Sequence, residues 1–89
     1  MTMGNFRVYF ATEENAFETE CVEFGNKKDA MQYLLGLSDE RGIEIEDECI
    51  DGIDEEGYEF YACVSSAEKF SYVEGVLNEM RENYIEENF

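Results

Sequence analysis

Residues 43–64 read IEIEDECIDGIDEEGYEFYACV, and this stretch decides the fold. In residues 43–53, apolar and acidic side chains alternate with a period of two, which predicts a half-buried β-strand. Asp54-Glu55-Glu56-Gly57 follows as a four-residue hairpin signal, ending in a glycine that tolerates positive φ. Residues 58–64 are rich in aromatic side chains and predict the next strand. The stretch therefore predicts a β-hairpin with acidic residues along its first strand.

The alternation in residues 43–53 also predicts which side chains share a face of the sheet. Successive side chains of a strand point to opposite faces, so the glutamates should gather on one side, about 6.6 Å apart. We expect Ile43, Ile45, Asp47 and Cys49 on one face, and Glu44, Glu46, Glu48 and Ile50 on the other.

The residues before this stretch predict two strands and a helix. Residues 6–11 form an aromatic and β-branched run, Glu13-Glu14-Asn15 a polar turn, and residues 16–24 a second strand. Asn26 is expected to cap the helix, and Gly42 to end it in the left-handed conformation. Between them, apolar residues recur at helical spacing: Ala30, Tyr33, Leu34 and Leu37.

The residues after it predict a second helix. Ser65-Ser66-Ala67-Glu68 matches a capping box. The apolar stripe that follows consists of Phe70, Val73, Val76, Leu77, Met80 and Tyr84. The predicted order is therefore ββα-ββα in a single small acidic domain covering residues 1–89. We expect an α+β fold: a four-stranded, mainly antiparallel sheet with two helices on one face and a wet, acidic opposite face.

Net charge separates this chain from ordinary small domains. It has 23 Asp and Glu, only six Lys and Arg and no His, which gives a formal net charge of −17. Typical domains of this size carry a net charge of about 2–8 in magnitude, and self-repulsion opposes the compact state. A hydrophobic content of 44% with 15% aromatics excludes a disordered acidic chain. The charge therefore predicts a strongly basic partner, and the commonest basic surfaces bind nucleic acid.

Enzyme and metal chemistry find little support. The usual general base is missing because the chain has no His, and no Gly-rich phosphate loop or HExxH motif occurs. Residues 47–52 resemble the opening of a calcium loop, but Asp54 and Tyr58 stand at positions eight and twelve, where an apolar residue and a glutamate are needed. We expect a protein that is not an enzyme, with no cofactor and no metal site.

Cysteine usage and terminal sequence bear on location. Cys21, Cys49 and Cys63 form an odd set without a CxxC pair, so we expect buried free thiols and a reducing compartment. The first residues lack a signal-peptide pattern, and no apolar run approaches a membrane span. We expect a cytoplasmic protein with no membrane partner, and no direct binding to nucleic acid, because phosphates would be repelled.

The layout of the carboxylates indicates where a basic partner binds. A second row of acids lies along the last helix, at Glu79, Glu82 and Glu86. We expect the contact face to be the strand at residues 43–53, the following hairpin and the acids of the second strand. The candidate partner-binding residues are Glu18, Glu20, Glu44, Glu46, Glu48, Asp51, Asp54, Glu55, Glu56 and Glu59. The role of Lys27 and Lys28, at the helix end that the dipole disfavours for cations, is left open.

In size, charge and acidic elements the chain resembles the small acidic DNA-mimic proteins of phages and mobile elements, of the anti-CRISPR and antirestriction type. The resemblance rests on the charge of −17, the acidic strands at residues 16–24 and 43–53, and the acidic C-terminal segment RENYIEENF, residues 81–89. It implies a stoichiometric inhibitor that blocks the nucleic-acid-binding channel of a CRISPR effector or restriction nuclease. A phage-encoded inhibitor of this kind would act in the bacterial host cytoplasm.

Two other classes share the acidity. One is an immunity-type inhibitor of a basic nuclease toxin; the other is an acidic adaptor for a basic DNA-binding protein. Carboxylates distributed over two faces favour the mimic, and a tight acidic cluster around a protruding aromatic favours the immunity protein. A large apolar patch would favour an adaptor or a homodimer. The sequence leaves open whether the protein is a monomer or a homodimer.

Overall fold

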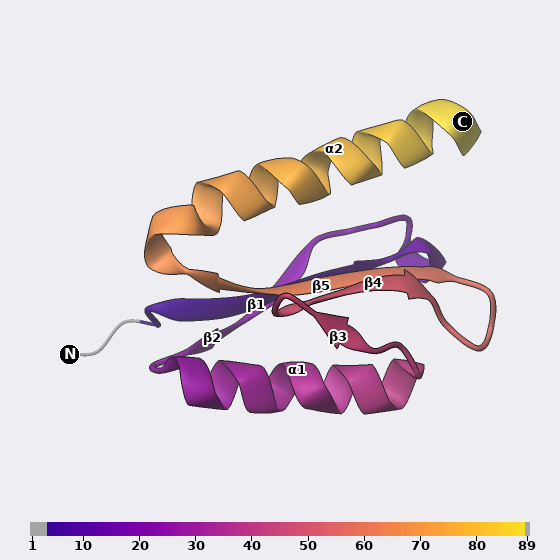
Figure 1. The fold of residues 1–89 in the computed structure, drawn as a ribbon. Helices are drawn as coiled ribbons and strands as arrows, with labels where there is room; N and C mark the ends of the chain where they lie inside the picture. Colours follow the sequence, from indigo (N-terminus) through magenta and orange to yellow (C-terminus); the bar gives the residue numbers. More distant parts are fainter. Residues whose placement is uncertain (1–3, 89) are drawn as a thin grey trace.

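The computed structural model describes residues 4–88 and has an α+β fold built on a five-stranded antiparallel sheet (Figure 1). The strand order is β2-β1-β5-β4-β3. The elements are β1 (Phe6–Thr12), the 3-10 turn η1 (Glu13–Asn15), β2 (Glu20–Phe24), α1 (Lys27–Arg41), β3 (Ile45–Glu46), β4 (Cys49–Ile53), β5 (Glu59–Ser66), the 3-10 turn η2 (Ala67–Lys69) and α2 (Phe70–Asn88). The α+β class is confirmed, but the order is ββαβββα and the sheet has five strands. Phe89, the last residue of the predicted acidic C-terminal segment, and residues 1–3 lie outside the described residues.

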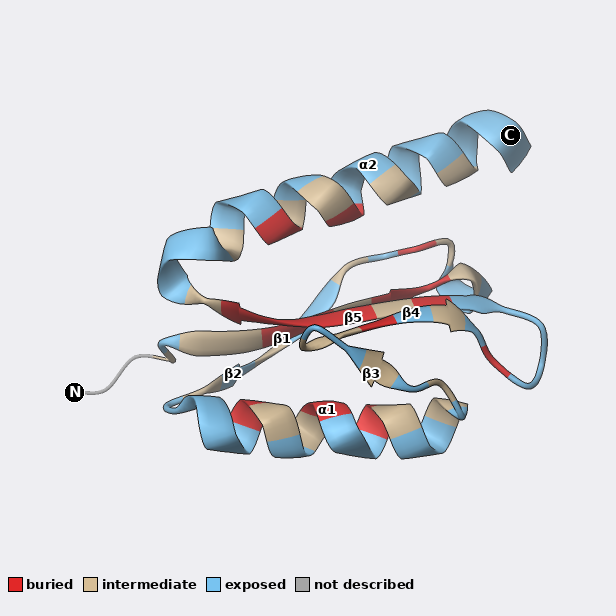
Figure 2. Ribbon diagram, viewed as in Figure 1, coloured by how far each residue is buried: buried red, intermediate tan, exposed pale blue. Residues whose placement is uncertain are grey.

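The two helices cover opposite faces of the sheet, so the prediction of both helices on one face is wrong (Figures 1 and 2). The central strands β1 and β5 are apolar on both sides, and each side therefore needs a cover. One core, against α1, consists of Val8, Ala30, Leu34, Leu37, Ile50, Phe60, Ala62 and Val64. The other, against α2, consists of Tyr9, Ala11, Phe17, Val73 and Leu77.

The predicted strand at residues 43–53 is in fact a tight hairpin. Ile45 pairs with Ile50 and Glu46 with Cys49, which leaves Asp47 and Glu48 as a two-residue turn. Both turn residues have positive φ, 52° for Asp47 and 63° for Glu48, as in a type I′ turn. The turn shifts the alternation, so Ile50 joins Ile43 and Ile45 on the α1 side. The predicted facing of Ile50 and Cys49 is therefore wrong.

The second strand begins later than predicted. Ala16 and Phe17 adopt left-handed φ values of 61° and 59°, so the chain bends there and β2 starts only at Glu20. Phe17 is buried under α2, where its ring meets Tyr84 edge-on at 5.4 Å between centroids. The bend gives the α2 core an aromatic side chain that a straight strand would not supply.

The helix ends test the local predictions directly. The Asn26 side chain accepts a 2.9 Å hydrogen bond from the Asp29 N–H, and Gly42 ends α1 with φ 70°, so both predicted caps are confirmed. The predicted capping box is wrong: the Ser65 hydroxyl donates to the Ser66 carbonyl, Ser66 takes the N-cap position without a side-chain cap bond, and η2 leads from β5 into α2. Gly57, with φ 92°, confirms the predicted hairpin turn. Neither helix in residues 4–88 is both long and apolar enough to cross a membrane.

Candidate acidic interface

Part of the sheet surface on the α2 side is left open at β3 and β4, because α2 packs on β1 and β5. The register brings Glu46 opposite Cys49 and Asp51 opposite Tyr61, so these four side chains share this open side. An open hollow of about 380 Å³ lies there. We call its lining the acidic sheet face: Glu44, Glu46, Asp47, Cys49, Asp51 and Tyr61.

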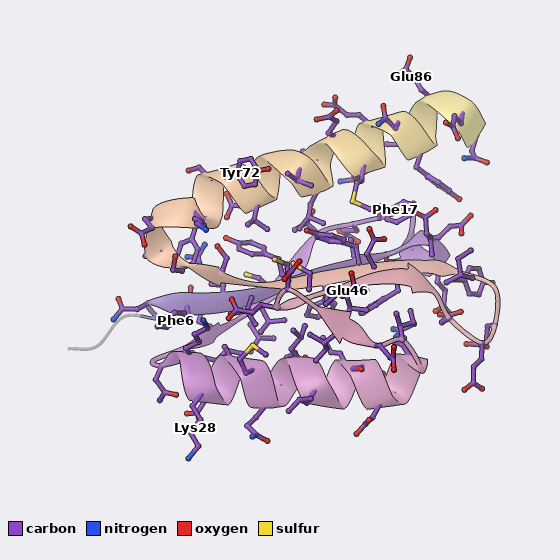
Figure 3. The ribbon with its side chains drawn as sticks, in the orientation of Figure 1. Phe6, Phe17, Lys28, Glu46, Tyr72 and Glu86 are labelled. Atoms are coloured by element: carbon purple, nitrogen blue, oxygen red, sulfur yellow. The ribbon has the colours of Figure 1, made fainter. Side chains whose placement is uncertain are left out.

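Four of the six side chains of the acidic sheet face are carboxylates, and these four are exposed. Figure 3 labels Glu46, which comes from β3 on the side of the sheet that α2 faces. Tyr61 is partly buried among the acids and the cysteines, and burial is the main cause that raises the pKa of its phenol above the ordinary value. The phenol therefore stays neutral and contributes a polar, uncharged centre to an anionic surface.

A second group of acids surrounds Arg41 where α1 ends. Glu14, Glu40, Asp54, Glu55 and Glu56 line an open hollow of about 400 Å³ with this arginine. The Arg41 guanidinium is 3.2 Å from the Asp54 carboxylate and 4.0 Å from that of Glu14. The Arg41 Cζ atom also lies over the Phe60 ring, 4.5 Å from its centroid, as in a cation–π contact.

Asp54 has a structural role within this group. Its carboxylate accepts hydrogen bonds from the N–H groups of Tyr58 (2.9 Å) and Glu56 (3.0 Å), and its side chain is only 4% exposed. These bonds, that from Tyr58 first, lower the pKa of Asp54 below its ordinary value. Glu55 and Glu56, by contrast, are exposed. Of the three predicted hairpin acids, two are therefore free to meet a partner.

The other predicted residues lie apart from these two groups. Glu20 is on β2, at the opposite edge of the sheet from β3, and Glu18 is exposed in the segment before it. Glu48, in the β3–β4 turn, pairs with Lys27 at the start of α1. Glu59 lines a third hollow, of about 390 Å³, with side chains from α2. The ten candidates thus do not form one continuous face.

Few of the carboxylates are neutralised within the protein. The ion pairs in residues 4–88 join Arg7 to Glu23 and Glu74, Lys27 to Glu48, and Arg41 to Glu14 and Asp54. The remaining acids of this part of the chain have no described Lys or Arg nitrogen within 4.0 Å. Lys27 thus acquires a structural partner, whereas Lys28 points away from the sheet on the far side of α1 (Figure 3).

Sequence reasoning missed two features of this surface. Asp47 was not among the candidates, although it lines the acidic sheet face. The cysteines were expected to be buried; Cys63 is, but Cys49 is half-exposed on the acidic sheet face and Cys21 is exposed on β2. The Asp47-Glu48 pair, read as a two-residue turn, is the signal that could have revealed the placement of Asp47 and Cys49.

No three His, Cys, Asp or Glu side chains in residues 4–88 are grouped so as to hold a metal ion. The arrangement offers charge complementarity and a few apolar contacts at separate places around the sheet. Comparison of the chain with protein-family models, with curated proteins and with solved structures gave no match.

Proposed function

We propose that this protein is a stoichiometric inhibitor that blocks the nucleic-acid-binding channel of a host defence nuclease by DNA mimicry. The target class is a CRISPR effector or a restriction nuclease. One observation carries the proposal: exposed carboxylates, most of them without a cationic partner, stand on separate parts of a small sheet rather than in one cluster.

The charge density supports this choice of partner. A net charge of −17 along a longest dimension of 43 Å is about one charge per 2.5 Å, compared with about one per 1.7 Å of axis in duplex DNA. A channel that binds DNA phosphates would therefore meet a similar density of negative charge on this protein. Complementary charge of this kind steers association and raises its rate by orders of magnitude.

Apolar anchors are available beside the acids. Ile53 is 67% exposed at the end of β4, and Tyr58 is 37% exposed in the adjoining hairpin. When a partner buries apolar side chains of this type, they supply affinity that salt does not screen. Ile53 and Tyr58 would therefore favour binding to a channel of complementary shape over binding to any other basic surface.

An immunity-type inhibitor of a basic nuclease toxin is the second candidate. It is favoured by the acidic sheet face, where acids surround Tyr61 in one hollow. Such an inhibitor needs this one patch alone, whereas a mimic also uses the acids near Arg41 and on β2. The two functions therefore differ in how many acidic groups contribute to binding.

The experiment is displacement of fluorescent duplex DNA from a panel of purified guide-loaded CRISPR effectors, restriction nucleases and nuclease toxins. We expect the protein to displace DNA from at least one CRISPR effector or restriction nuclease at a one-to-one ratio. Glu44→Gln/Glu46→Gln/Asp51→Asn should weaken this displacement at least tenfold. The matched control, Glu79→Gln/Glu82→Gln/Glu86→Gln, removes three charges from α2, whose Glu86 points away from the sheet (Figure 3), and should change it little.

Two results would contradict the proposal. Binding only to a nuclease toxin would favour the immunity-type inhibitor, and equal losses in both triple variants would mean that net charge rather than a defined face matters. Thermal unfolding of both variants confirms that each is folded before binding is compared.

A further inference from the structure

Two of the three cysteines lie side by side on neighbouring strands of the sheet. Cys49 on β4 and Cys63 on β5 are register partners, and their sulfur atoms lie 2.8 Å apart on the α2 side. The Val64 N–H donates a hydrogen bond to the Glu48 carbonyl (3.1 Å), and these two residues are the neighbours of Cys63 and Cys49 in their strands. Because the backbone bond joins the neighbours, the two cysteines form a non-hydrogen-bonded pair.

This register suits a covalent link without movement of the strands. Directly opposed residues of a non-hydrogen-bonded pair have Cα atoms about 4.5 Å apart, within the roughly 4.4–6.8 Å that disulfides span. Cys21 lies on β2, opposite Tyr9 and separated from β4 by the two strands β1 and β5, and has no such partner among the described cysteines.

The two thiols are also unequal in a way that suits stepwise chemistry. Cys49 is half-exposed in the wall of the acidic sheet face, whereas Cys63 is buried. The hydrogen bond between the two thiols lowers the pKa of Cys49 to about 7, and the same bond, followed by burial, raises the pKa of Cys63. An accessible thiolate with a neighbouring buried thiol is the arrangement of an attacking and a resolving cysteine.

We propose that Cys49 and Cys63 form a reversible dithiol–disulfide site whose oxidant is a low-molecular-weight disulfide. The Cys49 thiolate attacks one sulfur of the oxidant, forming a mixed disulfide and releasing the first small thiol. The Cys63 sulfur, as its proton leaves, attacks Cys49 Sγ and releases the second small thiol. The protein pair loses two electrons, the oxidant gains them, and the two cysteine protons end on the two released thiols.

The site is independent of the proposed inhibitory function, because it rests on the β4–β5 register alone. It joins the two strands that carry Asp51 and Tyr61, so oxidation would lock the spacing of the acidic sheet face. In a reducing cytoplasm the pair stays as thiols, and the disulfide forms when small-molecule disulfides accumulate.

The test uses the full chain with Cys21→Ser, treated with oxidised glutathione. We expect the intact mass to fall by two hydrogen atoms, free thiols to disappear, and dithiothreitol to reverse both changes. Cleavage after glutamates separates the two cysteines, since Glu55, Glu56 and Glu59 lie between them, and should yield one disulfide-linked peptide pair. Cys63→Ser in the same background should instead accumulate a glutathione adduct on Cys49.

Three outcomes would overturn the assignment: a stable glutathione adduct on Cys49 while Cys63 remains free, disulfide-linked dimers in place of the internal bond, or no reaction at either residue. If a serine variant fails to fold, the same peptide mapping on the unsubstituted protein decides between these outcomes, because Cys21 lies in a separate peptide.

Discussion

The Arg41 guanidinium lies 3.2 Å from the Asp54 carboxylate and thereby joins the end of α1 to the turn between β4 and β5. The same carboxylate holds the turn itself, through the N–H groups of Glu56 and Tyr58. An acid that looks like part of a partner-binding surface in the sequence is thus a fixed element of the fold. The chain uses Asp54 to close its hairpin and leaves Glu55 and Glu56 exposed beside it.

Asp54→Asn should lower the thermal midpoint at neutral pH, because the amide can still accept from the turn N–H groups but no longer pairs with Arg41. The folded-state pKa of Asp54 lies below its ordinary value of 3.8. Its stabilisation is therefore fully present above that value and is lost as the pH falls through the folded-state pKa. Thermal melts across the acid range should show the wild type losing its advantage over Asp54→Asn; a pH-independent difference would contradict the charge pairing.

Glu48→Gly should stabilise the protein by on the order of 1 kcal/mol, because left-handed φ is unfavourable for a residue with a Cβ and Asp-Gly is a preferred type I′ turn. The lost ion pair with Lys27 is exposed and offsets at most part of this gain. Urea denaturation measures the change. Glu48→Gln is the control: it removes the charge but keeps the strained conformation, so it should not stabilise by a similar amount.

Tyr9→Phe should destabilise the protein by about 1 kcal/mol, the usual contribution of one hydrogen bond. The buried Tyr9 hydroxyl donates to Glu74 of α2 at 2.5 Å and accepts from Arg7 at 2.9 Å, so it connects the sheet to this helix. Denaturant melts give the free energy, and amide exchange should increase most in α2. Unchanged exchange in α2 would show that the apolar core alone holds the helix.

Added salt should raise the thermal midpoint, because most of the carboxylates lack a cationic neighbour and repel one another across the surface. The comparison between low and moderate NaCl should show a smaller rise for Glu44→Gln/Glu46→Gln/Asp51→Asn, from which three charges have been removed. A midpoint insensitive to salt in the wild type would mean that charge repulsion does not limit its stability.

Local signals predicted the parts of the fold that depend on neighbouring residues. The Asn26 cap, the Gly42 helix end and the turn at Gly57 each follow from the chemistry of a few adjacent residues, and all three are confirmed. The Asp47-Glu48 turn escaped prediction because glutamate seldom adopts positive φ, so the alternation seemed to continue. That one turn changed the strand count and the facing of Ile50.

The side of the sheet that each helix covers depends on contacts distant in sequence, which a local pattern does not specify. A signal was nevertheless present in β5, where Phe60, Tyr61 and Ala62 begin a continuous apolar run typical of a strand covered on both faces. Most of the candidate acids are exposed, as their charge predicts, whereas Asp54 is buried. Pairing does not follow from charge alone, because the partners of Asp54 and Glu48 lie 13 and 21 residues away in the sequence.

The salt dependence of DNA displacement from a responsive nuclease tests the central claim most directly, namely that carboxylates on separate parts of the sheet, those of the acidic sheet face among them, stand in for phosphates. Inhibition constants would be measured over a NaCl series for the wild type and for the two triple variants. The account predicts a steep loss of affinity with salt, a shallower slope for Glu44→Gln/Glu46→Gln/Asp51→Asn and an unchanged slope for Glu79→Gln/Glu82→Gln/Glu86→Gln. An affinity that does not change with salt, or equal slopes for all three proteins, would contradict it.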